Sequence, residues 1–210
     1  MEKHIDILIV GAGISGIGLA VHLSKHCPQR QFDIIERRES FGGTWDFFKY
    51  PGIRSDSDMS TFGFNFKPWQ KANVLADGAS IKGYLLEVLD EYKLKEKIHF
   101  QHRVLAANYD STQKKWVVEI EDENQKKQTW IANFVLGCTG YYNYDQGFQP
   151  NFPNQQAFKG QLIHPQFWPA DLQYAGKKVV IIGSGATAIT LVPALAKGGA
   201  EHVTMLQRSP

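Results

Sequence analysis

Cysteine is scarce in this chain of 210 residues, which contains only Cys27 and Cys138. Two cysteines that lie more than a hundred residues apart provide neither a disulfide framework nor the ligand spacing of a metal site. We therefore expect a reducing compartment and no bound metal. This indicates a cytoplasmic location, and it leaves peripheral association with a membrane open.

An excess of charge of either sign is also missing, since 23 Lys and Arg residues balance 21 Asp and Glu residues. This balance argues against nucleic acid or an anionic membrane as a partner. Hydrophobic residues make up 43% and charged residues 21%, which excludes a disordered or collagen-like chain. The length predicts one or two domains.

Long apolar runs without interruption are absent as well. Residues 7–24 and 179–196 each run for 18 residues without Asp, Glu, Lys or Arg, which is the length of a short membrane span. Glycines interrupt both runs near their start, so we expect a strand, a turn and a helix inside a soluble core. A signal peptide is not expected, because Asp6 precedes the first run and no small-residue cleavage site follows.

The two runs are copies of one pattern, related by an offset of 172 residues. Each copy predicts a strand, a glycine-rich turn, a helix and a second strand. The expected strands are 7–10 and 32–35 in the first copy, and 179–182 and 203–206 in the second. Such a pair indicates two βαβ starts and not a solenoid.

Both copies fit the dinucleotide fingerprint G-x-G-x-x-G/A. The first glycine allows a tight turn, the second lets backbone approach a pyrophosphate, and the third keeps helix and strand close. The helix N-terminus then offers free N–H groups and a partial positive charge to the phosphates. The fingerprint residues are Gly11, Gly13 and Gly16, then Gly183, Gly185 and Ala188.

The residue that follows the second strand distinguishes the two copies. Glu36 and Arg208 each lie 25 residues after the first glycine of their copy. A carboxylate accepts hydrogen bonds from a ribose diol and repels a 2′-phosphate, whereas an arginine binds that phosphate. The first copy therefore suits FAD or NAD, and the second suits NADP. The alternative is that both are solvated charges at strand ends.

The segment between the copies is rich in aromatic and turn residues over 40–70. A long ordered loop is usually functional, and the pair Gly42-Gly43 would let backbone approach a flat ring. A surface loop packed by its own aromatics is the other interpretation. After it, a stripe at helical spacing predicts a core-facing helix; its members are Ile81, Leu85, Val88, Leu89 and Tyr92.

Three further strands are expected at 100–106, 116–120 and 129–136, the last two joined by a polar hairpin. His99 and His102 are expected to face opposite sides of a strand and to be structural.

Four motifs in order give the chain a resemblance to a known family. They are GAGISG, GGTW, YPGIRSDSD, and the series Phe158-x-Gly160-x-x-x-His164-x-x-x-Trp168-Pro169. The chain resembles the class B flavoprotein monooxygenases of the Baeyer–Villiger type over essentially its whole length. Its segments YPGIRSDSDM, CTGYYNYD and IGSGATAITLVPALA are most similar to a mycobacterial member.

This resemblance implies an α/β fold with two Rossmann-like dinucleotide-binding βαβ units, FAD first and NADP second, and a small β-meander in the first. The implied parts are an FAD-binding domain at 1–140, a linker with the histidine–tryptophan fingerprint at 141–176, and the start of an NADP-binding domain at 177–210.

The resemblance also implies a set of site residues. Those expected at the FAD phosphates and ribose are Gly11, Gly13, Ser15, Gly16 and Glu36. Those expected along the flavin and at the adenine are Thr44, Trp45, Asp46 and Val104. Those expected to hold NADP are Arg54, Ser55, Gly183, Ser184, Gly185, Ala186, Thr187, Ala188, Ile189, Gln207 and Arg208.

Three residues are expected to take part in catalysis by the same resemblance. Asp56 would lie near flavin and nicotinamide and orient an arginine, while His164 and Trp168 would couple the domains during NADPH binding. From spacing alone, His164 fits a buried structural histidine equally well. The implied reaction inserts one oxygen atom from O₂ into a ketone, giving an ester or lactone, or oxygenates sulfur.

The second glycine unit is short of the further parallel strands that a doubly wound domain requires. We therefore expect an N-terminal portion of a longer monooxygenase that does not turn over by itself. Two alternatives remain, a flavin monooxygenase restricted to nitrogen and sulfur, and a non-catalytic nucleotide-binding remnant. A disulfide reductase is disfavoured because neither cysteine has a redox partner nearby.

Overall fold

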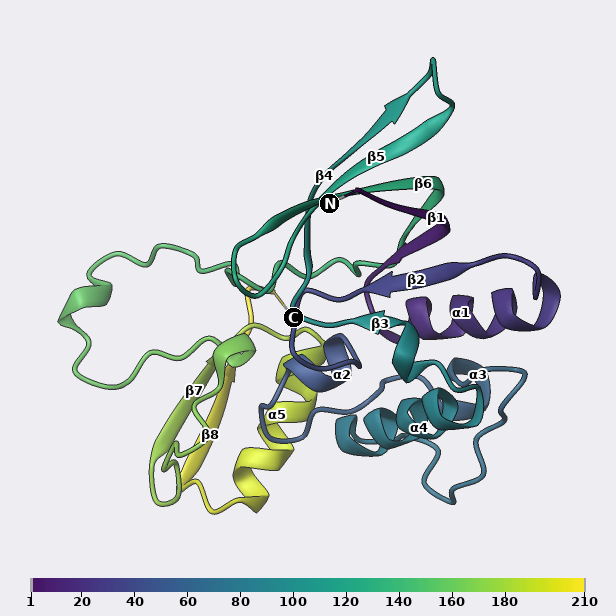
Figure 1. Cartoon of the computed structure of the whole chain (residues 1–210). Helices are drawn as coiled ribbons and strands as arrows, with labels where there is room; N and C mark the ends of the chain where they lie inside the picture. The colour runs from purple at the N-terminus through teal and green to yellow at the C-terminus, as the bar shows by residue number, and fades with distance from the viewer. Residues whose placement is uncertain (1, 210) are drawn as a thin grey trace. The chain divides into compact units, whose positions relative to one another are not determined.

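The N-terminal strand lies inside a six-stranded mixed sheet, as the computed structural model, which describes residues 2–209, shows (Figure 1). The strands are β1 (Glu2–Val10), β2 (Phe32–Ile35), β3 (Ile98–His99), β4 (Arg103–Asp110), β5 (Lys115–Glu121) and β6 (Lys127–Gly137), in the order β3-β2-β1-β6-β5-β4. The pairs β1–β2, β1–β6 and β2–β3 are parallel, and β4, β5 and β6 form an antiparallel meander. The predicted α/β fold with its meander is confirmed.

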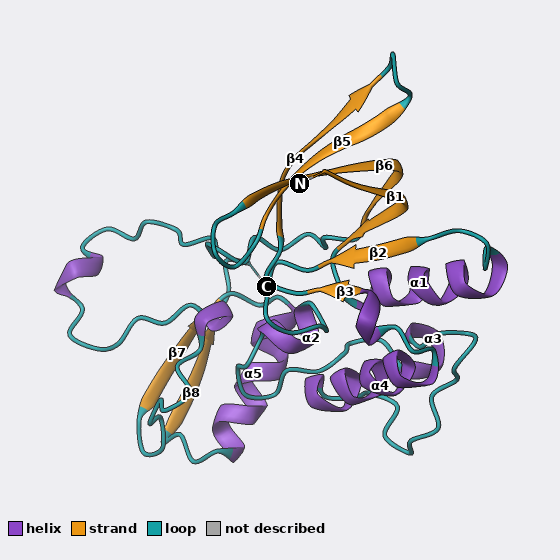
Figure 2. Ribbon diagram, viewed as in Figure 1, coloured by secondary structure: helices purple, strands orange, loops and turns teal. Residues whose placement is uncertain are grey.

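A second, two-stranded parallel sheet holds β7 (Lys178–Ile182) and β8 (His202–Leu206), as Figure 2 shows. The helices are α1 (Ile14–His26), α2 (Thr44–Phe47), α3 (Met59–Phe62), α4 (Gly78–Glu91) and α5 (Ala186–Lys197), with short 3-10 turns at Lys95–Lys97, Gln155–Ala157 and Pro165–Phe167. Both apolar runs thus form a strand, a turn and a helix, as predicted. None of the helices formed by residues 2–209 combines the length and apolar character needed to cross a bilayer.

The contacts divide the chain into two compact units that differ from the boundaries expected from the sequence. The first unit contains residues 1–46 and 81–141, and the second contains 47–80 and 142–210. Residues 47–80 join the second unit because Phe48 and Tyr50 are buried in one cluster with Leu191 of α5. The expected boundaries at 140 and 176 follow chain order, so they do not include the grouping of residues 47–80 with residues 142–210. Which dinucleotide each unit binds stays a prediction.

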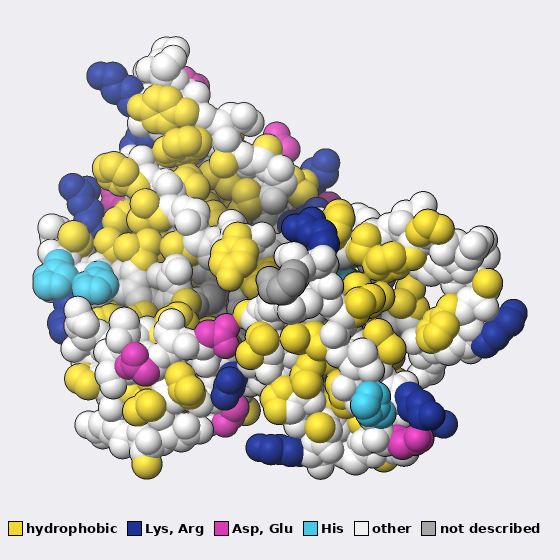
Figure 3. All heavy atoms as spheres, turned by 180° about the vertical axis from the view of Figure 1, so that it is seen from behind, with side chains coloured by type: hydrophobic (Ala, Val, Ile, Leu, Met, Phe, Trp, Pro, Cys, Tyr) yellow, Lys and Arg dark blue, Asp and Glu magenta, His cyan; other side chains and the backbone are white. Residues whose placement is uncertain are grey.

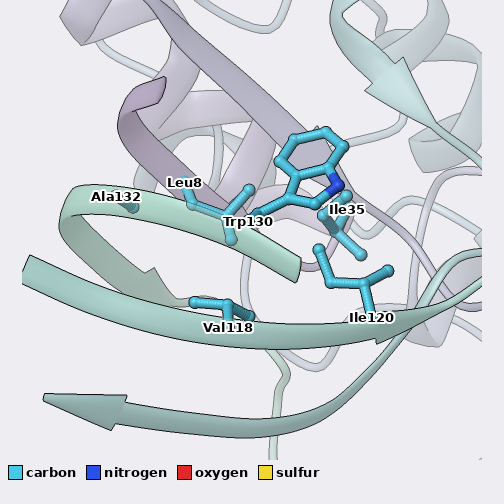
Figure 4. Packing of buried hydrophobic residues seen from close by; sticks show 6 residues of the cluster. All are labelled: Leu8, Ile35, Val118, Ile120, Trp130 and Ala132. Atoms are coloured by element: carbon cyan, nitrogen blue, oxygen red, sulfur yellow. The ribbon is translucent and has the colours of Figure 1, made fainter. Parts of the chain in front are cut away.

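One core cluster of the first unit is formed by side chains from β1, β2, β5 and β6. Figure 4 shows its members pointing toward one another: Leu8, Ile35, Val118, Ile120, Trp130 and Ala132. Burying one large aliphatic side chain contributes roughly 1.5–3 kcal/mol. Trp130 is 2% exposed, and its indole N–H donates to Gln128 Oε1 at 3.3 Å. Leu8 faces this core, whereas Ile9, with the opposite parity on β1, faces Gly16 of α1.

The predicted strand over 100–106 is wrong in its bounds. The chain leaves β3 at His99, turns through Gln101 with φ +55°, and enters β4 at Arg103. The turn is held because the N–H of Gln101 donates to Arg38 O and that of His102 to Glu36 O, both at 3.0 Å. These bonds wrap the chain around the end of β2. The predicted strands over 116–120 and 129–136 are confirmed within β5 and β6.

The prediction that the two histidines face opposite sides of one strand is therefore wrong. His99 ends β3 and His102 lies in the turn, with their rings edge to face at 5.8 Å between centroids. His99 Nε2 also lies 3.3 Å from Asp33, which Lys3 contacts at 2.7 Å. Burial raises the pKa of Asp33, but the hydrogen bonds and charges of His99 and Lys3 outweigh it and lower the pKa overall. The described residues contain no group of three His, Cys, Asp or Glu side chains suited to a metal.

The predicted helical stripe is confirmed in α4. Ile81, Leu85, Val88 and Leu89 are all buried, while Tyr92 follows the end of the helix and is half-buried. On the face that Figure 3 presents, basic and acidic side chains are interspersed.

The third fingerprint glycine decides how close helix and turn lie. A Cβ at Gly16 would come 1.9 Å from the carbonyl oxygen of Gly11, so a side chain cannot fit there. The equivalent Ala188 of the second copy is itself buried, at 5% exposed. In α5 the corresponding space therefore accepts a methyl group.

We expect Gly16→Ala to lower the free energy of unfolding by about 1–3 kcal/mol or more, because helix and turn must move apart. The matched control is Gly83→Ala in α4, where a Cβ would meet nothing within 4 Å. That control should raise stability by roughly 0.5–1 kcal/mol, since alanine loses less entropy in a helix. Urea unfolding followed by tryptophan fluorescence measures both, and equal effects would contradict the close-approach explanation.

Candidate dinucleotide-binding sites

The first glycine turn is built for close approach of backbone. Gly11 has φ +110°, and a Cβ there would lie 2.4 Å from Cys138 O. Its N–H donates to Ile35 O at 2.7 Å, which ties the turn to the end of β2. Helix α1 then begins after Gly13, whose φ is −81°, without a side-chain cap. The first N–H groups of α1, with Ser15 among them, are thus left for an anion.

Glu36 lies directly after β2 and is buried, as a ribose-binding acid should be. Its Oε2 accepts a hydrogen bond from the N–H of Ala12, and its Oε1 accepts one from the N–H of Arg38, each at 2.9 Å. The carboxylate therefore sits beside the glycine turn, and it is not a solvated strand-end charge. That alternative is excluded for the first copy.

The GGTW segment lies against the same turn. The N–H of Gly42 donates to Ala12 O at 2.9 Å, and a Cβ at Gly13 would lie 3.7 Å from the Cα of Gly43. Gly42 has φ +111° and Gly43 φ +55°, conformations that favour glycine. The helix α2 that follows starts with Thr44 and Trp45, both half-buried. The structure thus brings these predicted flavin contacts next to the first glycine turn.

The carboxylate of Asp46 is engaged by two cations. It is buried, with Arg38 Nη2 at 2.7 Å from Oδ2 and the ammonium of Lys82 on Oδ1. Sequence reasoning missed both cations, and no local signal could have found Lys82, which lies 36 residues away on α4. Val104, expected at the adenine, lies in β4 opposite Ile120, where the register begins to shift.

The second glycine turn repeats the first with more open space. Gly183 has φ +121° and donates its N–H to Leu206 O at 2.8 Å, which fastens the turn to the end of β8. A Cβ at Gly183 or Gly185 would meet nothing within 4 Å. Helix α5 begins after Gly185, without a side-chain cap. The remaining predicted residues of this turn and helix start are Ser184, Ala186, Thr187, Ala188 and Ile189.

Gln207 and Arg208 follow Leu206, the residue that fastens this turn, and both side chains are exposed. The arginine is therefore positioned next to the second turn in the chain, just as Glu36 follows Ile35 at the first. The exposure of Arg208 leaves the alternative of a solvated charge open for this copy.

The YPGIRSDSD segment is packed on α5 within the second unit. Gly52 has φ +84°, and a Cβ there would lie 2.5 Å from Thr190 O. Ser55 is buried and donates its hydroxyl to Ser57 O at 2.7 Å, while Arg54 forms a β-bridge with Asp77. Asp56 is exposed.

Two aspartates in and after this segment have structural roles that sequence reasoning did not assign. Asp58 accepts a hydrogen bond from the N–H of Thr61 at 3.0 Å at the start of α3, and Asp77 accepts one from Ser80 at 2.7 Å at the start of α4. These backbone hydrogen bonds lower the pKa of each carboxyl.

The histidine–tryptophan fingerprint is held by backbone contacts. A Cβ at Gly147 would lie 2.4 Å from the His164 ring, whose Nδ1 accepts a hydrogen bond from Gln166 N at 3.2 Å. The buried Gln166 donates its side-chain amide to Asn143 O at 2.5 Å. Trp168 packs at the edge of the cluster around Leu191. His164 is half-buried, so it is not the fully buried histidine of the alternative interpretation.

We expect Gly147→Ala to displace the His164 ring, because a methyl group cannot occupy the same space. The NMR signals of the His164 ring should shift and broaden. Gly137→Ala is the control, since a Cβ there meets nothing within 4 Å. Unchanged His164 signals in Gly147→Ala would show that the ring has room to spare.

Comparison with known proteins places these features in one family. The model of the flavin-binding monooxygenase-like family matches residues 4–209. The chain is 82% identical, over its full length, to the protein named "Probable FAD-binding monooxygenase AlmA" of Acinetobacter baylyi. It is also 56% identical over its full length to the "FAD-containing monooxygenase EthA" of Mycolicibacterium smegmatis. The expected similarity to mycobacterial members is confirmed, but the identity to the Acinetobacter protein is higher. The chain covers 42% of each of these relatives.

A solved structure gives the same result for the fold. The cyclohexanone monooxygenase from Rhodococcus sp. Phi1 bound to NADP+ superimposes with a TM-score of 0.79 at 28% identity, over 100% of this chain and 39% of that one. The family model, the sequence relatives and this structure all indicate a flavin-dependent monooxygenase. The chain belongs to the flavin-binding monooxygenase-like family and spans about two fifths of the length of the curated relatives it matches.

Proposed function

We propose that this chain is the dinucleotide-binding part of an FAD- and NADPH-dependent monooxygenase of the Baeyer–Villiger type. The observation that carries the proposal is the contrast between two similar glycine turns. The first is followed by the buried acid Glu36, and the second by the exposed base Arg208. An acid suits the bare ribose of FAD, and a base suits the 2′-phosphate of NADP.

The residues of the first turn fit FAD. The N-terminus of α1 is uncapped by a side chain, and Gly13 places no side chain of its own there. Glu36 accepts hydrogen bonds from two backbone N–H groups, which fix its carboxylate beside the glycine turn, where it would accept further bonds from ribose hydroxyls. Thr44 and Trp45 would lie along the flavin from the adjacent loop.

The residues of the second turn fit NADP in the same way. The free space over Gly183 and Gly185 is the space that a pyrophosphate would fill. Arg208 and Gln207 would hold the 2′-phosphate, and Arg54 with Ser55 would contribute from the loop packed on α5.

When bound, the two cofactors supply the electrons and the activation of O₂ that a monooxygenase requires. The residues of this chain then orient them. Asp56 is exposed, so its carboxylate is available to orient a cationic group. The Nδ1 of His164 accepts a backbone hydrogen bond, so a neutral ring carries its proton on Nε2, where it can donate to a ligand.

The substrate that we propose is a ketone, converted to an ester or lactone, or a sulfur compound. The specific motif that favours the Baeyer–Villiger branch is the series from Phe158 to Pro169, in which Phe158 packs over Gly160 and His164 over Gly147. A flavin monooxygenase restricted to nitrogen and sulfur would fail a ketone assay. Absence of turnover by the 210-residue chain, and its cytoplasmic location, stay predictions.

Titration of the chain with FAD, followed by quenching of flavin fluorescence, tests the first site. Gly13→Ala should reduce FAD affinity by about tenfold or more, since a methyl group would block the pyrophosphate. The fold should tolerate it, because the contact at 3.7 Å is ordinary and φ is −81°. A chain that binds no FAD in either form would instead favour the non-catalytic remnant.

The second site is tested with 2′,5′-ADP and 5′-AMP, which differ in the 2′-phosphate. We expect Arg208→Ala to lower the affinity for 2′,5′-ADP by about tenfold or more, because charge-assisted hydrogen bonds to the 2′-phosphate are lost. The affinity for 5′-AMP should stay unchanged. Gly185→Ala should weaken both nucleotides, without affecting FAD. Equal affinity of the unaltered chain for the two nucleotides in calorimetry would rule out the assignment of NADP.

A further inference from the structure

We propose that Lys82 and Asp46 are positioning residues that lock the 38–46 loop onto the first glycine turn before any nucleotide binds. The proposal rests on the proposed function only in its consequence for FAD. The lock itself is a property of the first unit, and all of its residues lie there.

Asp46 is the anchor of the lock. Its side chain is 7% exposed, so its charge is largely removed from water. A buried carboxylate persists only when it is paired and hydrogen-bonded. Arg38 reaches one oxygen from the start of the loop, and Lys82 reaches the other from α4. The acid therefore holds together two segments that the chain separates.

Lys82 touches the loop at more than one place. Its ammonium donates to Ser40 Oγ at 3.0 Å and lies 5.3 Å from the ring centroid of Phe41. A Cβ added at Gly42 would lie 3.6 Å from the Cγ of Lys82, so the stem of the lysine passes beside this glycine. A single side chain from α4 thus spans the loop from Ser40 to Asp46, and its stem and charge both contribute.

The loop is joined to the first glycine turn through the backbone of Ala12. The N–H of Ala12 donates to Glu36, and its carbonyl accepts from Gly42. Arg38 connects Glu36 to Asp46, because its N–H donates to Glu36 and its guanidinium pairs with Asp46. The ribose acid, the glycine turn and the loop are therefore connected by consecutive hydrogen bonds and ion pairs.

The consequence is that the cost of ordering this loop is met during folding and not during binding. A ligand that meets an already ordered site binds more tightly, because fewer side chains and backbone torsions are immobilised on association. Asp46 would then support FAD indirectly, through the loop, in place of the direct flavin contact that the sequence suggested.

The first experiment measures amide hydrogen exchange of the nucleotide-free chain. We expect Lys82→Met, which keeps the apolar stem, to speed exchange at Gly42 by about tenfold or more, because local opening becomes easier. Exchange at Leu8 in the core should stay unchanged. Lys82→Arg should restore slow exchange at Gly42. The matched control is Lys126→Met in the β5–β6 hairpin, which should alter neither amide.

If Lys82→Met fails to fold, Ser40→Ala provides a second test, since it removes one hydrogen-bond acceptor of the Lys82 ammonium. It should speed exchange at Gly42 by a smaller factor than Lys82→Met. Exchange at Gly42 that stays within about twofold of the unaltered chain in the folded variants would overturn the lock.

The second experiment titrates the same variants with FAD. Lys82→Met should lower FAD affinity by about tenfold, and Lys82→Arg should restore it. If the unaltered chain binds no FAD, the proposed function fails while the exchange data still decide the lock. If Gly42 exchanges faster and FAD affinity is unchanged, the loop is locked but has no part in binding, which overturns the functional half of this proposal.

Discussion

The glycine turn of the first unit depends on the backbone of Ala12, whose N–H and C=O are both hydrogen-bonded. Its N–H is directed at the carboxylate of Glu36, and its carbonyl receives the N–H of Gly42. These two bonds fix the distance between the glycine turn, the end of β2 and the loop that carries GGTW. If either bond were lost, a buried backbone N–H or C=O of Ala12 would be left unsatisfied, which is costly in a low-dielectric interior. These bonds therefore hold Glu36, the glycine turn and Gly42 next to one another.

The two copies of the glycine pattern have the same order of strand, turn and helix, but they differ in whether a side chain fits at the third position of the fingerprint. In the first, α1 approaches its turn so closely that only hydrogen fits at position 16. In the second, a buried Ala188 occupies the equivalent place and the turn has open space around it. The second unit gains its support elsewhere, from the YPGIRSDSD segment, in which Gly52 lies directly against Thr190 of α5.

Local patterns predicted the elements well where the chain alternates regularly. The strand at 32–35 and the helical stripe of α4 follow directly from hydrophobic periodicity. The pattern failed at residues 100–106, where Gln101 adopts a left-handed conformation that its residue type does not signal. The histidine pair was misplaced for the same reason. A turn held by hydrogen bonds to Glu36 and Arg38 has no local signature, because its partners lie more than sixty residues away.

The sequence by itself determined the two glycine turns, the acid and the base that follow their second strands, and membership of the monooxygenase family, since each rests on residue types at short fixed spacings. Only the tertiary structure decided that residues 47–80 pack with the second unit and that Asp46 is held by Arg38 and Lys82. The physical reason is range. Backbone conformation is encoded by neighbours a few residues apart, whereas the pairing of a buried charge depends on which distant cation the folded chain brings within reach.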